Sequence, residues 1–279
     1  MQHPILQWLG CCDTAYLQMI ELHGLVKTFG ELRAVDGINL TIPKGEFFAV
    51  LGPNAAGKTT TIKMMVGLIK PTEGFARVAG YDIQQQPLKA RERLAYVPDF
   101  PFLYDKLTPV EFMQFTGQLF NIDPDRVRTQ GSELAERFHL EPFLNKSIEG
   151  LSHGTRQRVA IASALLHDPE VFVIDEPMVG LDPQHARIVK DILKERSQKG
   201  MTVFLSTHQL SVAEELADRI GIIHQGRLVA VGTLNDLREQ SGHDEALESS
   251  FLRLTSEQAA QGAHGQLDLL PGIHHHHPL

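Results

Sequence analysis

Residues 52–59 of the chain are Gly52-Pro53-Asn54-Ala55-Ala56-Gly57-Lys58-Thr59. They match the phosphate-binding pattern G-x-x-x-x-G-K-[ST]. The apolar run 47–51 predicts a buried strand before this loop, and residues 60–66, which lack Gly and Pro, predict a helix after it. This order aims backbone N–H groups at one point, which favours a polyphosphate site over a glycine turn without a ligand. The sequence therefore predicts a bound nucleoside triphosphate, with Lys58 at the β- and γ-phosphates and the Thr59 hydroxyl on Mg²⁺.

Around this loop, apolar runs alternate with helical patterns, which predicts an α/β fold. Residues 171–174 and 202–205 are short, β-branched and apolar, so we expect them to be central parallel strands. Residues 220–224 and 227–231 flank Gln225-Gly226, which predicts a β-hairpin.

Residues 100–155 predict a helical insertion between the phosphate loop and the next core strand. Thr108 and Glu111 have the spacing of a capping box, and Asp123 precedes the start of a second helix. The expected apolar positions are Phe112, Phe115 and Leu119 in the first helix and Val127, Leu134 and Phe138 in the second. We interpret the insertion as a second surface that must move relative to the first.

Two predicted strands end in residues suited to phosphate chemistry. Asp175 ends the run 171–174 beside the phosphate loop, where we expect it to hold Mg²⁺ through water. Glu176 follows and is expected to orient or deprotonate the attacking water. His208 follows the other strand and can donate to the γ-phosphate. The alternatives are an exposed acidic pair and a histidine with a core or surface role, and the place of these residues after central strands argues against both.

Further motifs in a fixed order resemble the ATP-binding subunit of ABC transporters, over residues 19–240. Besides the phosphate loop and the strand that ends in Asp175-Glu176, they are Leu151-Ser152-His153-Gly154 (the signature), Gly180-Leu181-Asp182-Pro183 (the D-loop), Thr207-His208 (the switch histidine) and Phe29 (adenine stacking). The resemblance implies an α/β phosphate-loop NTPase with a RecA-like core sheet, an N-terminal antiparallel β subdomain and an inserted helical subdomain.

The resemblance also implies a set of site residues for ATP and Mg²⁺. Nucleotide contacts are expected from Phe29, Gly52, Pro53, Asn54, Ala55, Ala56, Gly57, Lys58, Thr59 and Thr60. The signature residues Ser152, His153 and Gly154 would contact ATP held by a second subunit, and Asp182 belongs to the D-loop. Glu176 and His208 are the catalytic candidates, and Thr59 and Asp175 are the metal candidates.

The chain departs from the family pattern in three places. Ala55 replaces a frequent glycine of the phosphate loop, which is tolerable unless that position needs a positive φ. His153 and Thr155 replace the Gly and Gln of the common Leu-Ser-Gly-Gly-Gln signature. A histidine beside a phosphate could add a donor or make activity depend on pH near neutrality. Asp99 stands where the family has a glutamine that touches Mg²⁺, so it either binds the metal more directly or sits back from it.

The ends of the chain differ from its centre. Residues 1–18 are expected to be a non-essential extension, since a start at Met19 would open on a plausible strand. Residues 241–279 form a predicted tail, disordered from about residue 258, where Gly, Gln and His are frequent. The tract His274–His277 is expected to be solvated, with metal binding as the alternative.

Composition constrains the partners. The net charge of −8 argues weakly against a nucleic-acid partner, and no run approaches the roughly 18 apolar residues of a membrane span. The only cysteines are the adjacent pair Cys11-Cys12, which fits a reducing cytoplasm.

The resemblance implies an ATP-hydrolysing subunit that powers a separately encoded integral-membrane permease. Its partners would be a second ATP-binding subunit, identical or different, and the permease, at the inner face of the cell membrane. Residues 102–108 and 234–238 resemble the exporter-like, drug-resistance branch, and an importer subunit is the alternative within the family. A soluble ABC-type ATPase with a non-transport partner is the alternative outside transport. A nucleotide-gated binding module would need a disabled site, whereas Lys58, Glu176 and His208 are present.

Overall fold

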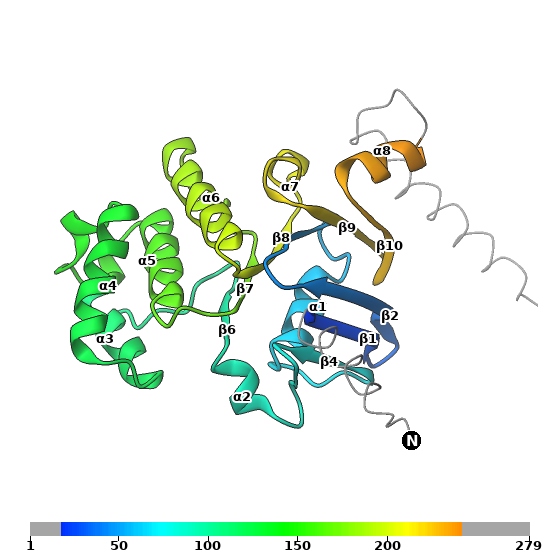
Figure 1. The fold of residues 1–279 in the computed structure, drawn as a ribbon, viewed down its shortest axis with the longest axis horizontal. Helices are drawn as coiled ribbons and strands as arrows, with labels where there is room; N and C mark the ends of the chain where they lie inside the picture. Colours follow the sequence, from blue (N-terminus) through cyan, green and yellow to red (C-terminus); the bar gives the residue numbers. More distant parts are fainter. Residues whose placement is uncertain (1–17, 242–279) are drawn as a thin grey trace, which may run out of the picture. The chain divides into compact units, whose positions relative to one another are not determined.

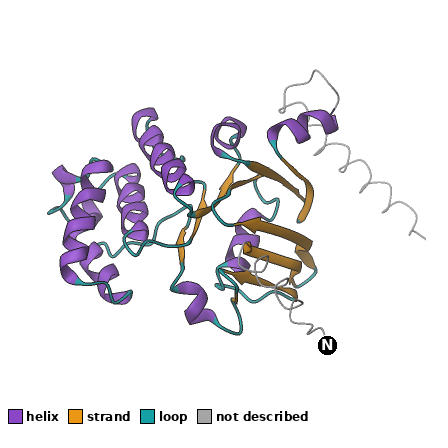
Figure 2. Cartoon of the chain, viewed as in Figure 1, coloured by secondary structure: helices purple, strands orange, loops and turns teal. Residues whose placement is uncertain are grey.

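The structure is a computed structural model that describes residues 18–241. The strands of these residues form two sheets (Figures 1 and 2). The smaller sheet has the strand order β2-β1-β4-β5 and the larger has the order β10-β9-β3-β8-β7-β6. The predicted extension before residue 18, the tail after residue 241 and the tract His274–His277 lie outside the described residues.

The smaller sheet is antiparallel. Its strands are β1 (Gln18–Phe29), β2 (Leu32–Pro43), β4 (Glu73–Val78) and β5 (Tyr81–Asp82). Gly30 makes the turn between β1 and β2 with φ 58°, a conformation that glycine adopts without strain. The inward side chains Ile20, Leu22 and Ile38 are buried in the core that the sheet shares with the first helix. This sheet is the predicted antiparallel β subdomain.

The larger sheet is mostly parallel. Its strands are β3 (Phe47–Leu51), β6 (Leu94–Val97), β7 (Val171–Asp175), β8 (Thr202–Thr207), β9 (Arg219–His224) and β10 (Arg227–Gly232). Every residue of β3, β7 and β8 is buried, as expected for parallel strands covered on both faces. Since these three strands are parallel neighbours, their carboxyl ends meet at one edge of the sheet.

Most helices pack against these sheets. They are α1 (Lys58–Met65), α2 (Pro87–Arg91), α5 (His153–Leu165), α6 (Pro183–Gln198) and α7 (Leu210–Leu216). The predicted hairpin is confirmed, because β9 and β10 pair antiparallel across Gln225 and Gly226. Both turn residues have positive φ, 47° and 79°, as a two-residue hairpin turn requires. The short helix α8 (Leu234–Ser241) begins where the first compact unit of the chain ends, and has Asp236 in its first turn and Arg238 in its last.

The helical insertion consists of α3 (Pro109–Leu119) and α4 (Pro124–Arg137), followed by 3₁₀ turns at Glu141–Phe143 and Ile148–Gly150. Figure 1 shows α3 and α4 beside α5 at the end of this unit opposite β1 and β2. The predicted capping box is present, with the Glu111 N–H donating to Thr108 Oγ1 and the Glu111 carboxylate accepting from the Thr108 N–H. Asp123 caps α4 by accepting from two backbone N–H groups.

The helical face that carries the large apolar residues of α3 is only partly buried. Val127, Leu134 and Phe138 of the second helix are buried as expected. In α3, however, the buried positions are Pro109, Met113, Thr116 and Gly117, whereas Leu119 is 63% exposed. The large apolar residues recur with the period of a helix, but part of the face that they form is exposed to solvent and does not reach the hydrophobic core.

Candidate functional site

The phosphate loop joins the end of β3 to the start of α1, and both of its glycines are required by their surroundings. A Cβ on Gly52 would lie 2.4 Å from the Ile223 carbonyl oxygen, and one on Gly57 would lie 2.7 Å from the Ala34 carbonyl oxygen. Gly57 also has φ 105°. The loop is therefore held by β2 on one side and by the β9–β10 hairpin on the other.

The turn of the β9–β10 hairpin is hydrogen-bonded to the phosphate loop, a contact that the sequence motifs did not indicate and that we call the hairpin brace. The Gly226 N–H donates to the Ala56 carbonyl over 2.9 Å, and the Asp36 N–H donates to the Gly226 carbonyl over 2.8 Å. The Gln225-Gly226 turn was predicted from sequence, but its contact with the phosphate loop depends on residues about 170 positions apart. These contacts fix the backbone of the loop, whose N–H groups would face the phosphates.

Ala55 has φ 64°, in the left-handed region. The position therefore does need the positive φ on which the sequence prediction depended, and an alanine occupies it at the cost of local strain. The residue is exposed, so its methyl group meets no packed neighbour.

Lys58 lies at the centre of the loop with only 6% of its surface exposed. Its amine donates to the carbonyl oxygens of Gly52 at 2.7 Å and Pro53 at 3.2 Å, and lies 3.7 Å from Glu176 Oε1. A buried cation held by neutral carbonyls and one carboxylate is placed to bind the oxygens of a polyphosphate.

Thr59 and Asp175 form the candidate metal site. The Thr59 hydroxyl donates to Asp175 Oδ2 over 2.8 Å, while Asp175 Oδ1 is buried and has no hydrogen-bond partner among the described residues. Mg²⁺ prefers such hard oxygen ligands, supplied by one or two side chains and completed by phosphate oxygens and water. The residues present therefore fit a magnesium ion that arrives with the nucleotide.

Glu176 is held in an unusual conformation. It follows β7 with φ 48°, and its N–H donates to the Ser206 carbonyl of β8 over 2.9 Å. Its side chain, 12% exposed, places one oxygen toward Lys58 and the other 2.9 Å from His208 Nδ1. Backbone strain of this kind is frequent at functional sites, where it aims a side chain that a relaxed backbone would turn away.

These groups lie together at the carboxyl edge of β3, β7 and β8, and the chemistry of phosphate transfer suggests a role for each. Glu176 would accept a proton from, or orient, the attacking water. His208, about half exposed and hydrogen-bonded to Glu176, would hold that carboxylate and donate to a phosphate oxygen. Mg²⁺, when bound, would neutralise charge that develops on the phosphate oxygens.

Phe29 lies at the tip of the β1–β2 hairpin and is 49% exposed, with the Lys27 amine 5.0 Å from the centre of its ring. The same hairpin contacts the phosphate loop through Ala34. An exposed ring beside a phosphate site can stack on a nucleobase, and the Lys27 amine makes a cation–π contact with the same ring.

The signature residues are at the start of α5. Ser152 is the N-cap and its Oγ accepts from the Thr155 N–H, 3.3 Å away. The His153 ring lies 5.6 Å from the Phe100 ring, and a Cβ on Gly180 would come within 2.4 Å of the His153 ring. The signature therefore packs on the D-loop of its own chain, and the geometry does not place it over the phosphate loop of that chain.

Asp182 is the N-cap of α6 and belongs to the D-loop. Its carboxylate accepts from the backbone N–H groups of Gln184 and His185 and lies 2.5 Å from His185 Nδ1. The hydrogen bonds with His185 lower the pKa of Asp182. Asp182 is thus a helix cap with an exposed carboxylate, at the turn that follows Glu176.

Asp99 is exposed and makes no hydrogen bond or ion pair with any residue that the structure describes. Its charge and that of Asp175 both raise the pKa of Tyr96, although burial is the larger cause. Asp99 therefore lies within electrostatic reach of the same tyrosine as the metal candidate Asp175. Among the described residues, no group of three or more His, Cys, Asp or Glu side chains is arranged so that it could hold a metal ion by itself.

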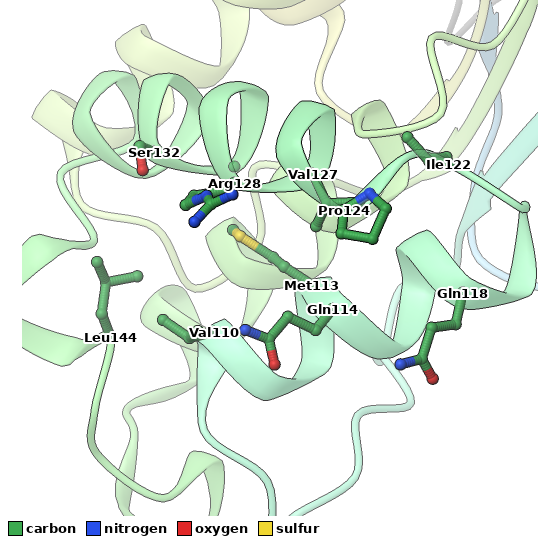
Figure 3. A pocket seen from close by; sticks show the side chains of 11 residues that line it. Val110, Met113, Gln114, Gln118, Ile122, Pro124, Val127, Arg128, Ser132 and Leu144 are labelled. Atoms are coloured by element: carbon green, nitrogen blue, oxygen red, sulfur yellow. The ribbon is translucent and has the colours of Figure 1, made fainter.

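A separate pocket of about 390 Å³ opens between α3 and α4 (Figure 3). The helices approach closely where a Cβ on Gly117 would meet Val127 at 2.3 Å, and Leu144 lines the same pocket. Met113 and Arg128 face each other across the gap (Figure 3). None of the predicted site residues lines this pocket, so it is distinct from the nucleotide site.

The model of the family described as "ABC transporter" matches residues 35–179, which is more than half of the chain. The chain belongs to the ABC transporter family. As a member of it, the protein binds and hydrolyses ATP. A second model, for an AAA domain of a putative AbiEii toxin, matches residues 145–214, within the same ATP-binding fold.

Curated relatives of this ABC ATPase include resistance proteins. The linearmycin resistance ATP-binding protein LnrL of Bacillus subtilis is 36% identical over 82% of this chain and 74% of its own. The daunorubicin/doxorubicin resistance ATP-binding protein DrrA of Streptomyces peucetius is 36% identical over 91% of this chain and 75% of its own. The probable multidrug ABC transporter ATP-binding protein YbhF of Escherichia coli is 37% identical, but the match spans only 41% of that protein.

Solved structures agree with the fold. The ATP-binding subunit of an ABC transporter superposes with a TM-score of 0.81 at 33% identity, over 85% of this chain and 99% of that one. A dimeric ATP-binding cassette in a post-hydrolysis state with ADP and Pi has a TM-score of 0.72 at 28% identity, over 77% of this chain and 99% of that one. The predicted phosphate-loop fold is confirmed.

Proposed function

We propose that this ATPase powers a separately encoded integral-membrane permease of the exporter type, from the cytoplasmic face of the membrane. The names of its relatives, which concern drug resistance and export, support this direction. Among residues 18–241, no helix has the length and apolarity to cross a bilayer. In this proposal the permease supplies the membrane span.

An apolar groove of about 540 Å³ is the observation on which this proposal depends. It lies between β6, α3 and α5, and we call it the aromatic groove. Its exposed walls include Phe102, Tyr104, Phe112, Phe115 and Leu119. Phe102 is 88% exposed, Tyr104 57% and Leu119 63%, so large apolar side chains face solvent here. Exposed apolar patches of this kind are typical of binding sites for a partner.

The position of the aromatic groove links such a partner to the ATP site. The groove is also lined by Tyr96, Val97 and Pro98, the three residues that precede Asp99. Tyr96 pairs with Val173 of β7, two residues before the metal candidate Asp175. A permease segment seated in the groove would therefore contact the strand that adjoins the candidate metal site.

Dimer closure would supply the driving force. The signature of one subunit would cover ATP held by the phosphate loop of another, in a homodimer or a heterodimer. The γ-phosphate then stabilises the closed dimer only, so ATP binding closes it and hydrolysis releases it. Each closure would move the insertion of one subunit together with the permease segment in its groove.

The test is affinity capture of the Glu176→Gln variant from detergent-solubilised native membranes in the presence of Mg-ATP, followed by mass spectrometry. We expect a near-stoichiometric protein with several membrane spans. Phe102→Asp in the same background should lose this protein. Leu88→Asp, at an apolar residue 74% exposed on α2 and outside the groove, should retain it.

Three other results would change the assignment. Capture of soluble partners alone would favour the non-transport ABC ATPase. Retention of the membrane protein in Phe102→Asp, or its equal loss in both aspartate variants, would count against the groove as the docking site. Recovery of a free ATP-bound dimer without any partner would also weigh against a permease.

A further inference from the structure

Thr155 occupies the signature position at which related cassettes commonly have glutamine, and its hydroxyl is buried. Only 4% of the residue is exposed. Thr155 Oγ1 lies 2.9 Å from Ser152 Oγ and 3.3 Å from Arg158 Nη2. These three residues lie on successive turns at the start of α5, with Ser152 at the exposed end and Arg158 at the buried end.

The chemistry of the groups limits the donor directions in this set of hydrogen bonds. A guanidinium only donates, so Thr155 Oγ1 accepts from Arg158. Either hydroxyl can donate across the contact between Thr155 Oγ1 and Ser152 Oγ, and Ser152 Oγ also accepts from the Thr155 backbone N–H. When Thr155 is the donor, both acceptor positions of Ser152 are used and the Ser152 O–H is left to donate outward.

Three other helical threonines of the described chain behave differently. The hydroxyls of Thr61, Thr116 and Thr129 each donate to the carbonyl four residues earlier. This is the usual arrangement for threonine inside a helix. The hydroxyl of Thr155 instead contacts two side chains, Ser152 and Arg158, whereas the hydroxyls of the other three bond to backbone carbonyls of their own helices.

Arg158 provides a fixed positive charge behind this chain. It is 3% exposed, and its Nη1 donates to the carbonyl oxygens of Phe138 at 2.5 Å and His139 at 3.0 Å. These carbonyls end α4, so the guanidinium is immobilised between the helical insertion and α5. A charge held in a buried environment polarises the hydrogen bonds connected to it.

We propose that Thr155 is a positioning residue that orients and polarises the Ser152 hydroxyl, through Arg158, to donate to the γ-phosphate of ATP bound by a second subunit. This inference rests on the proposed dimeric site. It assigns to a threonine a role that needs no direct contact with the nucleotide. With threonine at position 155 in place of the common glutamine, the signature would still recognise the phosphate, through the oriented Ser152 hydroxyl.

The experiment measures the dissociation constant of the ATP-dependent dimer by analytical ultracentrifugation, in the Glu176→Gln background with Mg-ATP. Thr155→Val, which keeps the shape and removes the hydroxyl, should weaken the dimer roughly five- to tenfold. Thr155→Ser restores the hydroxyl and should return affinity to within about twofold of the reference. Binding of labelled ATP to the monomer should be the same in all variants, because Thr155 lies outside the phosphate loop of its own chain.

Two further variants separate positioning from a structural role. Ser152→Ala should weaken the dimer at least as much as Thr155→Val, and the double variant should be no weaker than Ser152→Ala alone. Thr116→Val removes a hydroxyl of similar burial in α3 and should leave the dimer unchanged.

The outcomes distinguish this inference from the function on which it depends. If Ser152→Ala weakens the dimer and Thr155→Val does not, the positioning role is wrong and the dimeric site stands. The positioning role is also wrong if the two effects are additive. If Ser152→Ala has no effect, or the reference forms no ATP-dependent dimer, the dimeric site is overturned and the inference with it.

Discussion

The phosphate loop and the signature differ in how much of their site the chain itself provides. The loop, with Lys58, Asp175 and Glu176, lies at the edge of a parallel sheet where each polar group has a partner from a neighbouring strand or loop. The signature has an exposed serine whose hydroxyl is hydrogen-bonded only to Thr155 among the described residues. One region is a nearly complete site, and the other is half of a site that a second subunit would complete.

This difference has a physical origin. The sheet edge is formed by the buried strands β3, β7 and β8. Because these strands belong to the close-packed core, any rearrangement of the edge would cost packing free energy. The signature is anchored to the insertion through Arg158 and to the D-loop through Gly180. A region attached to an element that can move is suited to sense a partner, whereas a rigid region is suited to hold the nucleotide.

The largest effect is expected from Glu176→Gln, which tests whether the rigid region contains the catalytic base. Phosphate release should fall by about 100- to 10,000-fold, because the amide cannot accept the proton of the attacking water. ATP affinity should remain, and ATP-bound dimers should accumulate. Turnover close to that of the parent protein would remove Glu176 from the catalytic assignment.

The next effect concerns Asp99, at the joint between the two regions. Asp99→Gln should change the hydrolysis rate, or its stimulation by the permease, by roughly tenfold while ATP binding persists, because it removes a negative charge near the candidate metal site. Asp99→Asn is the matched control, since it removes the charge without adding length. Unchanged steady-state kinetics of Asp99→Gln, alone and with the partner, would exclude a role for this residue.

A smaller effect concerns acid stability at the contact between the insertion and the core. His167, after α5, stacks on Phe120 at a ring distance of 3.8 Å, and burial lowers its pKa to about 4. Between about pH 6.5 and pH 4 the unfolded chain, with an ordinary histidine pKa, binds a proton at His167, whereas His167 of the folded chain stays neutral. His167 therefore costs stability as the pH falls through this window.

His167→Phe keeps the stacking and removes the titration, so the loss of stability from pH 7.5 to pH 5 should shrink by about 2 kcal/mol. Urea unfolding at both pH values measures it. An equal loss in the parent and variant would show that the folded protein protonates His167 as readily as the unfolded chain does.

The smallest effect is expected at Ala55, within the rigid region. Ala55→Gly should stabilise the protein by about 0.5–1 kcal/mol, because glycine adopts φ 64° without strain. Ala79, with φ 49° at a turn outside the site, provides the control. Ala79→Gly should give a similar gain without changing ATP affinity. A loss of stability at Ala55 alone would indicate that the methyl group packs against the loop.

The fold could largely be predicted from sequence because its signals are local. The apolar runs that became β3, β7 and β8, the Gln225-Gly226 turn and the capping box at Thr108 each follow from neighbouring residues. The buried face of α3 could not be predicted in the same way. Phe112, Phe115 and Leu119 have a helical period, but only tertiary packing decides whether a helical face meets the core or a groove.

For the site, the motifs alone were sufficient to name the candidate residues, since phosphate chemistry needs particular groups at particular spacings along a strand, loop and helix. Three features depended instead on contacts between distant residues. They are the hairpin brace on the phosphate loop, the bond between Glu176 and His208, and the path from Arg158 through Thr155 to Ser152. Spacing along a chain predicts which groups are available, whereas their orientation depends on the elements that pack around them.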